Sequence, residues 1–418
     1  MVAGYIIVLG YDVLAVRFAG RTLCTATHRA RLVVSCAFSN NPLSLATGIV
    51  AMRQVRRQPR WWRDFLAGIG HRVRRRSRAS PAHATAEDID RARPIVERSL
   101  RTYANLVYRR DKALIFSDRG NAFLMYGYMH RTCIAMGDPV GPPEESRALI
   151  SRFHELSCET GRRPVFFEVR GDNESIYREL GLTLTKLGEE ARVELARFDI
   201  DMRGHAELRQ ASARVRRKDC RFEIVPKQSV LSLTPELLRV SEAWLAAKAT
   251  GEKGFSNASF DADYLSNFPV AVVRDARGVI AFANLWESAQ KEELSVDLMR
   301  HVPDAPNGTM DYLFTEILLW GRQYGFRWFN FGVAPLSGLE TADDVTLWDR
   351  VGTLLYRHGE HFYNFQGLRH YKEKFGPVWT PRYLASPGGL ALPLVLLDIT
   401  ALVAGGVRAI VSRHRRAR

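Results

Sequence analysis

The chain has 418 residues, of which 46% are hydrophobic and 25% are charged, a composition that is ordinary for a folded protein of two or three domains. The formal net charge of +15 lies in the flanks, because ten arginines fall within residues 53–80 and five within residues 408–418. Residues 81–407 carry a net charge of −2, so total charge gives no argument for a nucleic-acid-binding core.

Two apolar pieces begin the chain, residues 5–19 and 32–52. The first contains Asp12, and the second has a polar Ser-Asn-Asn-Pro stretch at its centre, so free insertion of either into a bilayer is unfavourable. Neither piece shows a small-residue cleavage site after a basic start, and we therefore expect no signal peptide.

Residues 53–86 form an Arg-rich linker in which Trp61, Trp62 and Phe65 lie between the cations. This composition is typical of a segment that lies on a membrane surface, and equally of a disordered basic tether. The five cysteines of the whole chain show neither paired spacing nor a CxxC motif. They predict reduced thiols in a cytoplasmic compartment and no metal site.

From residue 87 the pattern becomes α/β. Apolar residues recur at helical spacing in six segments: residues 87–108, 143–160, 203–217, 234–249, 307–324 and 361–375. Short runs of β-type residues occupy ten others: residues 113–117, 121–128, 131–136, 164–169, 192–198, 221–225, 269–274, 278–286, 292–299 and 327–331.

This region contains a weak internal repeat, because its two halves show the same order of elements. Residues 117–125 lead through a hairpin to residues 134–138, then to a proline and a helix. Residues 275–282 lead in the same way to residues 295–297, again followed by a proline and a helix. The repeated hairpin, strand and helix indicate duplication of one acyltransferase-sized unit.

Residues 360–385 combine aromatic, cationic and glycine residues more densely than an ordinary surface or core. Five of them recur at helical spacing and predict an apolar stripe that faces a core: Phe362, Phe365, Leu368, Tyr371 and Phe375. A neighbouring stripe is polar with a glycine notch: Asn364, Gly367, His370 and Lys374. Arg369 and Glu373 are placed to pair, and Gly376 followed by Pro377 predicts the end of the helix.

Several common catalytic motifs are absent. The chain has no GxxxxGK[ST] phosphate loop, no GxSxG nucleophile elbow and no HExxH metal motif. It also lacks a convincing glycine-rich pyrophosphate turn of the kind that acyl-coenzyme A enzymes use. The acyl group must therefore arrive already activated, and we expect no cofactor.

The run 360–385 closely resembles the C-terminal signature of the aminoacyl-phosphatidylglycerol synthases (phosphatidylglycerol lysyltransferases, the multiple peptide resistance factor family). Five further blocks resemble the same family in the same order: residues 136–141, 186–191, 281–284, 295–301 and 331–339. The resemblance covers residues 88–408.

The resemblance implies an α/β (α+β) fold of two tandem N-acetyltransferase-like modules with central mixed sheets, preceded by a short membrane-associated N-terminal segment. We place the first module at residues 87–205 and the second, catalytic one at 206–386.

Residues 1–52 resemble, at 11–17 and 37–41, the beginning of the flippase domain that usually precedes this synthase, and we interpret them as a truncated remnant. Residues 387–418 are then an apolar helix and a basic tail. Pro393, Asp398 and Gly405-Gly406 disfavour a clean span there, so the helix is expected to pack on the catalytic domain or to lie against the bilayer.

The resemblance further implies transfer of an aminoacyl group, lysyl on family frequency alone, from aminoacyl-tRNA to the glycerol hydroxyl of phosphatidylglycerol. The product is a less anionic lipid, which supports resistance to cationic antimicrobial peptides. The implied partners are the acceptor end of aminoacyl-tRNA, phosphatidylglycerol and the anionic membrane surface, with a homo-oligomer left open. The implied location is the bacterial inner membrane, with the catalytic domain facing the cytoplasm.

This reaction needs a cation for the lipid phosphate, an anion for the ammonium of the amino acid, and donors for the developing oxyanion. By motif, Asp297 and Arg300 belong to the family's active-site set, and we assign ammonium recognition to Asp297 and phosphate or ester contact to Arg300. Strict alternation along a strand puts the two on opposite faces, so a bulge or strand end between them is required. The alternative is a structural ion pair between them.

The remaining site residues form a second group. Glu360 and Lys374 are candidate catalytic residues, and a solvated lysine is the alternative for Lys374. Five others are candidates for substrate binding: Arg382, Asn330, Ser337, Tyr363 and His370. Arg382 is expected to hold the lipid phosphate or a helix C-terminus, and residues 331–339 to form a wall of the channel for the tRNA end. Glu189 and Glu190 are expected to join the two modules.

Two other functions stay open on sequence alone. One is a relative that acts on another acceptor, such as a peptidoglycan-type amine, or on an acyl-coenzyme A substrate. The other is a non-catalytic protein that binds acidic membrane through its flanks. The motif blocks favour the lipid transferase over the first, and the presence of both Asp297 and Arg300 weighs against the second.

Overall fold

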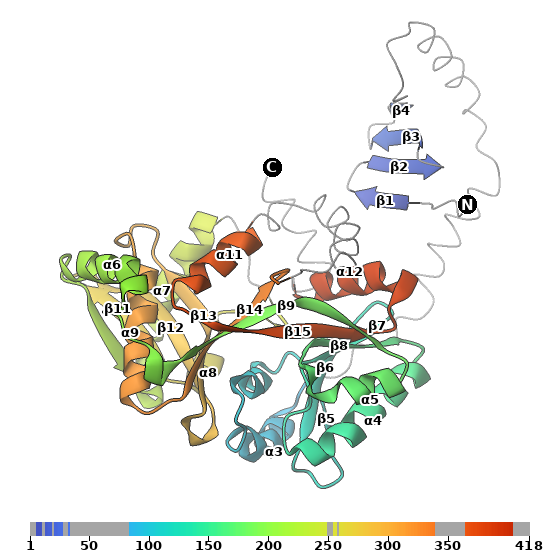
Figure 1. Cartoon of the computed structure of the whole chain (residues 1–418), viewed down its shortest axis with the longest axis horizontal. Coiled ribbons are helices and arrows are strands. Elements are labelled where there is room, and N and C mark those ends of the chain that lie inside the picture. Colours follow the sequence, from blue (N-terminus) through green and yellow to red (C-terminus); the bar gives the residue numbers. More distant parts are fainter. Residues whose placement is uncertain are drawn as a thin grey trace, which may run out of the picture. The chain divides into compact units, whose positions relative to one another are not determined.

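The structure is a computed structural model of the whole chain (Figure 1). It describes residues 83–248, 254–256, 259–338 and 364–403, together with the backbone of four strands near the N-terminus. The chain divides into two compact units, residues 1–79 with 353–359, and residues 80–352 with 360–418.

In the first unit, four strands form an antiparallel sheet in the order β1-β2-β3-β4. Their bounds are Ile6–Gly10, Val13–Phe18, Arg21–Thr27 and Leu32–Val33. The membrane attachment predicted for residues 1–52 stays a prediction. Residues 53–82 of the predicted linker lie outside the described part of the chain.

The second unit is α/β, as predicted, and is built on one large mixed sheet. Its 11 strands lie in the order β10-β11-β12-β13-β14-β9-β15-β8-β7-β6-β5. The bounds are β5 Ala113–Phe116, β6 Phe123–Met129, β7 Thr132–Met136, β8 Arg163–Val169, β9 Thr183–Glu194, β10 Arg221–Val225, β11 Val270–Asp275, β12 Gly278–Glu287, β13 Glu293–His301, β14 Trp328–Pro335 and β15 Val378–Ser386.

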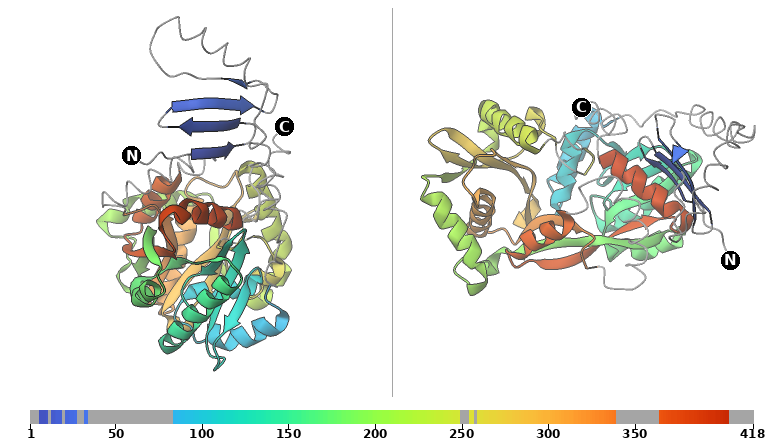
Figure 2. Two further views of the ribbon diagram at one scale, coloured as in Figure 1. Left: turned by 90° about the vertical axis from the view of Figure 1, so that its right-hand side faces the viewer. Right: turned by 90° about the horizontal axis from the view of Figure 1, so that it is seen from above.

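Helices cover both faces of this sheet. The α-helices are α3 Ala86–Val96, α4 Ser146–Glu159, α5 Glu174–Glu179, α6 Ala206–Arg216, α7 Val230–Lys248, α8 Ala262–Leu265, α9 Thr309–Gln323, α11 Asn364–Glu373 and α12 Leu392–Val403. The 3-10 helices are η1 Thr102–Arg109, η2 Pro143–Glu145, η3 Gly171–Asn173, η4 Leu195–Arg197, η5 Arg203–His205, η6 Lys227–Ser229, η7 Ala289–Lys291 and η8 Gly389–Ala391. In the C-terminal half, α7 lies on one face and α9 on the other, with α6 beside α9 (Figure 2). The strand between them, β12, is consequently buried on both sides along most of its length.

The two halves of the sheet repeat one pattern and exchange their last strands. Strands β5 to β8 pair antiparallel, antiparallel and parallel, and strands β11 to β14 do the same. Strand β9 then lies between β14 and β15, while β15 lies between β8 and β9, so each half inserts its final strand into the other (Figure 1). The repeat predicted from the sequence is therefore visible in the pairing, and the boundary at residue 205 stays an interpretation.

A glycine is required where β9 crosses into the second half. Gly188 has a φ of +156°, and a Cβ built there would collide with the carbonyl oxygen of Ala334 on β14. Any side chain would push the two strands apart at the point where the halves interlock.

Each half has its own aromatic core. In the first, the ring of Phe166 of β8 contacts Phe153 of α4 edge-to-face and Tyr177 of α5 at a tilt, with ring centroids 4.9 and 4.8 Å apart. Burial of each such side chain stabilises the fold by about 2–3 kcal/mol. In the second, Phe314 of α9 contacts a cluster of rings from β14 and the end of α11: Phe329, Phe331, Tyr371 and Phe375.

The C-terminal helix α12 packs on the outer face of β6 and β7. Its Asp398 accepts a hydrogen bond from Thr132 at 2.5 Å and contacts His130 at 2.6 Å. The described contacts place this helix on the first half of the sheet rather than on the second half, which was expected to be the catalytic domain that it packs on. Within the described residues, no helix combines the length and the apolarity that crossing a bilayer would need.

Some predicted elements differ from those observed. The helix predicted over 87–108 is two elements, α3 and η1, because the chain is extended at Arg101. The strand predicted at 192–198 is instead β9, which ends at Glu194, and β15 was not predicted. Leu368 of the predicted apolar stripe is 37% exposed, whereas Phe375 is buried. The predicted helix end is confirmed, since α11 ends at Glu373 and Gly376 has a φ of +63°.

Candidate functional site

A β-bulge in β13 displays Asp297. Ala283 of β12 pairs with Met299 and Leu285 pairs with Val296, so Asp297 and Leu298 together lie opposite the single residue Asn284. The side-chain oxygen of Asn284 accepts the backbone N–H groups of Asp297 at 3.4 Å and of Leu298 at 2.7 Å. The bulge predicted between Asp297 and Arg300 is therefore confirmed.

Asp297 is held by a short chain of neutral donors. The hydroxyl of Tyr264 on α8 donates to its carboxylate at 2.5 Å, and the indole N–H of Trp286 donates to the same hydroxyl at 3.0 Å. Burial and the adjacent Asp297 charge both raise the pKa of Tyr264 well above its ordinary value. The tyrosine therefore stays protonated and positions the carboxylate without neutralising its charge.

Cations from the first half lie near Asp297. Lys112, which is 2% exposed, contacts Asp111 at 2.6 Å, and Asp111 also pairs with Arg109 at 3.3 Å. Burial lowers the pKa of Lys112, and the charges of Asp111 and Asp297 oppose that shift. The Nε and Nη1 atoms of Arg109 are buried and have no hydrogen-bond acceptor. Two cationic groups from the other half, Lys112 and Arg109, thus lie near Asp297, and both are paired with the carboxylate of Asp111.

Arg300 lies on the α7 side of β13. It is 3% exposed, its guanidinium donates to the hydroxyl of Ser241, and its Cζ lies 5.2 Å from the centroid of the Trp244 ring. Because α7 and α8 also contact each other, the partners of Asp297 and Arg300 come from one side of the sheet.

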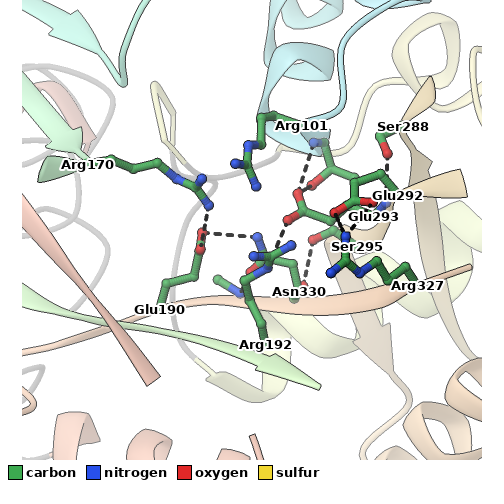
Figure 3. A network of polar contacts seen from close by, with 12 residues as sticks. Arg101, Arg170, Glu190, Arg192, Ser288, Glu292, Glu293, Ser295, Arg327 and Asn330 are labelled. Carbon is green, nitrogen blue, oxygen red and sulfur yellow. Dashed lines mark hydrogen bonds and ion pairs between the residues drawn. The ribbon is translucent and has the colours of Figure 1, made fainter. Parts of the chain in front are cut away.

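A second polar cluster lies at the centre of the sheet, where the halves interlock (Figure 3). Glu190 of β9 pairs with Arg382 of β15, accepts a hydrogen bond from Asn330 of β14 at 3.0 Å, and lies 3.5 Å from Arg170. Burial would raise the pKa of Glu190, but Arg382 and Arg170 outweigh it and lower the pKa to about 2. The predicted residues Arg382 and Asn330 thus come together in this cluster rather than beside Asp297.

The cluster continues toward the start of β13. Arg192 of β9 lies 3.2 Å from Glu293, which accepts hydrogen bonds from the backbone N–H and hydroxyl of Thr102 at 3.0 and 2.6 Å. The hydroxyl of Ser295 donates to the carbonyl oxygen of Asn330 at 2.7 Å. These contacts tie η1, β9, β13 and β14 together.

Glu168 is a residue that the sequence analysis missed. It lies in β8 with a φ of +62°, where the pairing with β15 shifts register. Burial raises the pKa of its carboxyl to about 7, with Glu190 adding to the shift and Arg382 and Lys372 opposing it. Left-handed backbone at a non-glycine residue and a strongly shifted pKa are both enriched at functional sites. The sequence around Glu168 looks like an ordinary buried strand, so no local signal was available.

The cations of the run 360–385 have acceptors inside the protein. Arg369 donates to Glu189 at 2.6 Å and to Glu373 at 3.0 Å, which confirms the expected pair with Glu373. The buried Lys372 donates to the carbonyl oxygens of Gly332 and Val333 at 2.9 and 3.0 Å. In the described part of this run, α11 and β15 therefore make polar contacts with β9 and β14. Glu189 and Glu190 of β9 take part in these contacts, as expected for residues that join the two halves.

The other predicted residues lie elsewhere. Lys374 pairs with Glu207 of α6 at 3.5 Å and Asp311 of α9 at 3.6 Å, on the face opposite α7. The side chain of His370 is 81% exposed. Ser337 is buried and accepts the backbone N–H of Glu189 at 3.0 Å, so its contact is with the scaffold. Glu360 and Tyr363 lie outside the described residues.

Comparison with known proteins gives one consistent result. Residues 93–386 match a family described as phosphatidylglycerol lysyltransferase, C-terminal. The phosphatidylglycerol lysyltransferase of Bacillus subtilis is 35% identical over 301 residues, which are 72% of this chain and 35% of that protein. The protein of the same name from Staphylococcus haemolyticus is 33% identical over 300 residues, 71% of this chain and 36% of that protein. The chain thus spans about a third of the length of these curated relatives.

Two solved structures cover nearly all of their own chains in the comparison. The C-terminal domain of a putative lysylphosphatidylglycerol synthetase from Agrobacterium fabrum is 43% identical, with a TM-score of 0.71 over 78% of this chain and 99% of that one. L-PGS from Bacillus licheniformis is 30% identical, with a TM-score of 0.66 over 77% of this chain and 98% of that one.

Proposed function

Because the chain belongs to the family of phosphatidylglycerol lysyltransferase C-terminal domains, we propose that it transfers an aminoacyl group, lysyl by preference, from aminoacyl-tRNA to a glycerol hydroxyl of phosphatidylglycerol. The observation that carries this proposal is the bulged Asp297 within a motif block of the family, whose carboxylate accepts from Tyr264, which in turn accepts from Trp286. The duplicated strand pattern supports two acyltransferase-like modules as the scaffold.

The chemistry is an ester exchange. A glycerol hydroxyl of the lipid attacks the carbonyl carbon of the aminoacyl ester, and the tetrahedral intermediate collapses with loss of the terminal ribose hydroxyl of the tRNA. The proton released by the attacking hydroxyl is taken up by the leaving ribose oxygen, so the reaction consumes no cofactor. What the protein must supply is orientation, charge complementarity and a route for one proton.

Asp297 is suited to hold the ammonium group of the amino acid. Its carboxylate is partly exposed, and its tyrosine donor is neutral, so a negative charge is presented at the bulge. Arg300 is almost fully buried against Ser241 and Trp244, and we assign it the supporting role of fixing α7 against β13. Direct contact between Arg300 and the lipid phosphate, expected from the motif, would need a displacement of α7.

The acceptor lipid places the reaction at a membrane surface. We propose the cytoplasmic face of the bacterial inner membrane, where aminoacyl-tRNA is available. The ten arginines of residues 53–80 and the five of residues 408–418 support attraction to anionic lipid, each contributing about 1 kcal/mol near the surface. Conversion of phosphatidylglycerol into a less anionic lipid would weaken the binding of cationic antimicrobial peptides.

The proposal is tested with the full-length protein, purified tRNA, lysyl-tRNA synthetase, labelled lysine and vesicles that contain phosphatidylglycerol. Label should appear in the lipid fraction, and ribonuclease added before the enzyme should abolish it. A parallel reaction with alanine and alanyl-tRNA synthetase measures donor preference. Lipid labelling that persists after ribonuclease treatment, or labelling of an amine acceptor in place of the lipid, would contradict the proposal.

A further inference from the structure

Three arginines from three separate elements converge at the centre of the sheet (Figure 3). Arg101 directly precedes η1, Arg170 follows β8, and Arg192 lies in β9. Their guanidinium groups point toward the space above Glu190 and Asn330. The side chains of Arg170 and Arg192 are only 18% and 13% exposed, so the space between the three guanidinium groups, called the recess below, is not an open basic surface.

Four cations lie close together around this space. The guanidinium groups of Arg170, Arg192 and Arg382 pair with two carboxylates, Glu190 and Glu293, and Arg101 adds a fourth cation. The more distant carboxylates Glu292, Asp138 and Glu168 also act on these arginines. Burial and the charges of Arg382 and Arg101 lower the pKa of Arg170, and Arg101 also lowers that of Arg192, which shows that the cations repel one another. Like charges gathered in a half-buried place are unfavourable unless an anion joins them.

The recess also holds unused donors. Nη2 of Arg192 is buried without an acceptor, and its Nε lies 3.2 Å from Glu293 without hydrogen-bond geometry. Within the described part of the chain, the guanidinium of Arg101 has no hydrogen-bond acceptor, and Arg101 remains partly accessible. These donors, with one nitrogen of Arg170 already at 3.5 Å from Glu190, are arranged around one space that a small oxyanion could fill.

The 3-10 helix η1 connects the recess to Asp297. Thr102 at its start binds Glu293 at the beginning of β13, and Arg109 at its end lies near Tyr264 and hence Asp297. The two sites therefore lie along one side of β13, four residues apart, which is about 13 Å along a strand. A phosphate, a glycerol hydroxyl, an aminoacyl ester and its ammonium, laid end to end, span on the order of 10 Å.

We propose that Arg101, Arg170 and Arg192 bind the phosphodiester of the phosphatidylglycerol headgroup, with its terminal hydroxyl directed along β13 toward Asp297. This inference rests on the proposed function and names the subsite for its acceptor. A headgroup is favoured over RNA because the three arginines surround one space and two of them are largely buried, whereas an RNA end carries several phosphates and is bound along an exposed basic groove. Residues 81–407 carry a net charge of −2, so total charge gives no argument for a groove of that kind.

The test compares Arg101→Gln with wild type and with Arg152→Gln as a matched control, since Arg152 pairs with Asp118 on the exposed surface. We expect the KM for phosphatidylglycerol in vesicles to rise at least about tenfold in Arg101→Gln, with the KM for aminoacyl-tRNA unchanged. Because the substitution relieves repulsion, the melting temperature should stay the same or rise. A rise in the KM for aminoacyl-tRNA alone would assign the recess to RNA and overturn the proposal, and so would unchanged KM values for both substrates.

A binding experiment separates this inference from the proposed function. Glycerophosphoglycerol, the soluble headgroup phosphodiester, should raise the melting temperature of wild type and of Arg152→Gln, and should have no effect on Arg101→Gln. If this binding holds while no lipid is aminoacylated, the transferase proposal fails and the phosphodiester site stands. If inorganic phosphate stabilises the protein and glycerophosphoglycerol does not, the site proposal fails whatever the activity.

Discussion

Asp138 and Asp297 occupy corresponding positions in the two halves of the sheet and are used in different ways. Each lies two residues beyond the last parallel pair of its half, which is Met136 with Phe167 in one and Ser295 with Asn330 in the other. The carboxylate of Asp138 accepts hydrogen bonds from the backbone of Arg170 at 2.8 Å, from Asn173 at 2.9 Å and from Tyr177 at 2.8 Å. Asp297 lies in a bulge with a tyrosine donor and two cations nearby.

The difference shows that duplication allows the same strand position to take two different roles. A carboxylate at the end of this strand has two uses: it can fix the next turn of chain, or it can face a substrate. The first half takes the former, because η3 and α5 fold back over Asp138 and satisfy its oxygens. In the second half β13 continues through a bulge instead of turning away, and under the proposed function Asp297 faces a substrate.

The strongest test of this contrast is Asp297→Asn. The substitution keeps shape but removes the charge proposed to hold the ammonium, so kcat/KM for lipid aminoacylation should fall by about a thousandfold. The free energy of urea unfolding should change by less than about 1 kcal/mol. Turnover equal to wild type would remove Asp297 from the site, and a large loss of stability would make it a scaffold residue like Asp138.

The reciprocal substitution is Asp138→Ala. It leaves the Arg170 amide, Asn173 and Tyr177 without their acceptor, and the free energy of unfolding should fall by about 2–4 kcal/mol. Measured at a temperature where the variant is folded, the KM for aminoacyl-tRNA should remain within about twofold of wild type. Asp138→Asn serves as the milder control, since its amide oxygen still accepts some of these hydrogen bonds.

Glu168 offers a third carboxylate, one held above its ordinary pKa. A carboxyl whose pKa rises from 4.5 to about 7 on folding contributes stability below pH 4.5 and loses it as the pH rises through 7. Glu168→Gln stays neutral, so its unfolding free energy at pH 8 should exceed that of wild type by on the order of 2 kcal/mol, and the two should converge near pH 4.5. Parallel urea titrations at the two pH values check this, and a gain that does not depend on pH would exclude the ionisation as its cause.

Tyr264→Phe should give the smallest effect. It removes the donor that orients Asp297 while leaving the ring packed on Phe268, whose centroid lies 5.1 Å away. We expect kcat to fall by about five- to tenfold, which corresponds to roughly 1 kcal/mol, with a small fall in melting temperature because the indole N–H of Trp286 loses its acceptor. Measurement of kcat and KM separately checks this, because loss of orientation should appear in kcat whereas loss of packing should lower the melting temperature further.

Local pattern predicted the hairpins of each half well, since β6 and β12 are continuous apolar runs bounded by turns. It failed at β15 because Pro381 and Arg382 argue against a central strand, and this strand is nevertheless paired on both sides. It also missed the extent of β9, where Lys186 and Glu189 interrupt the apolar pattern at the crossing point.

The site residues likewise divide into those that local sequence predicted and those that it did not. Asp297 and its bulge followed from a motif and from strand alternation, both of which are local. The partners of the central cluster did not, because Arg101, Arg170 and Arg192 come together only through the packing of η1, β8 and β9. The backbone conformation of Glu168 depends on its register against β15, a strand more than two hundred residues away in the chain. Charges brought together by distant strands leave no signature in any one segment.

The exchange of β9 and β15 has a consequence for how the protein is made. During synthesis the first half emerges with β8 and β9 but without the strand that belongs between them, and that strand, β15, follows all the other strands of the sheet in the chain. The ribosome must therefore translate β10 to β14 before the middle of the sheet can close. Until then, the edges of β8 and β9 that β15 will cover stay unpaired. A product that terminates before β15 would leave the sheet of both halves incomplete.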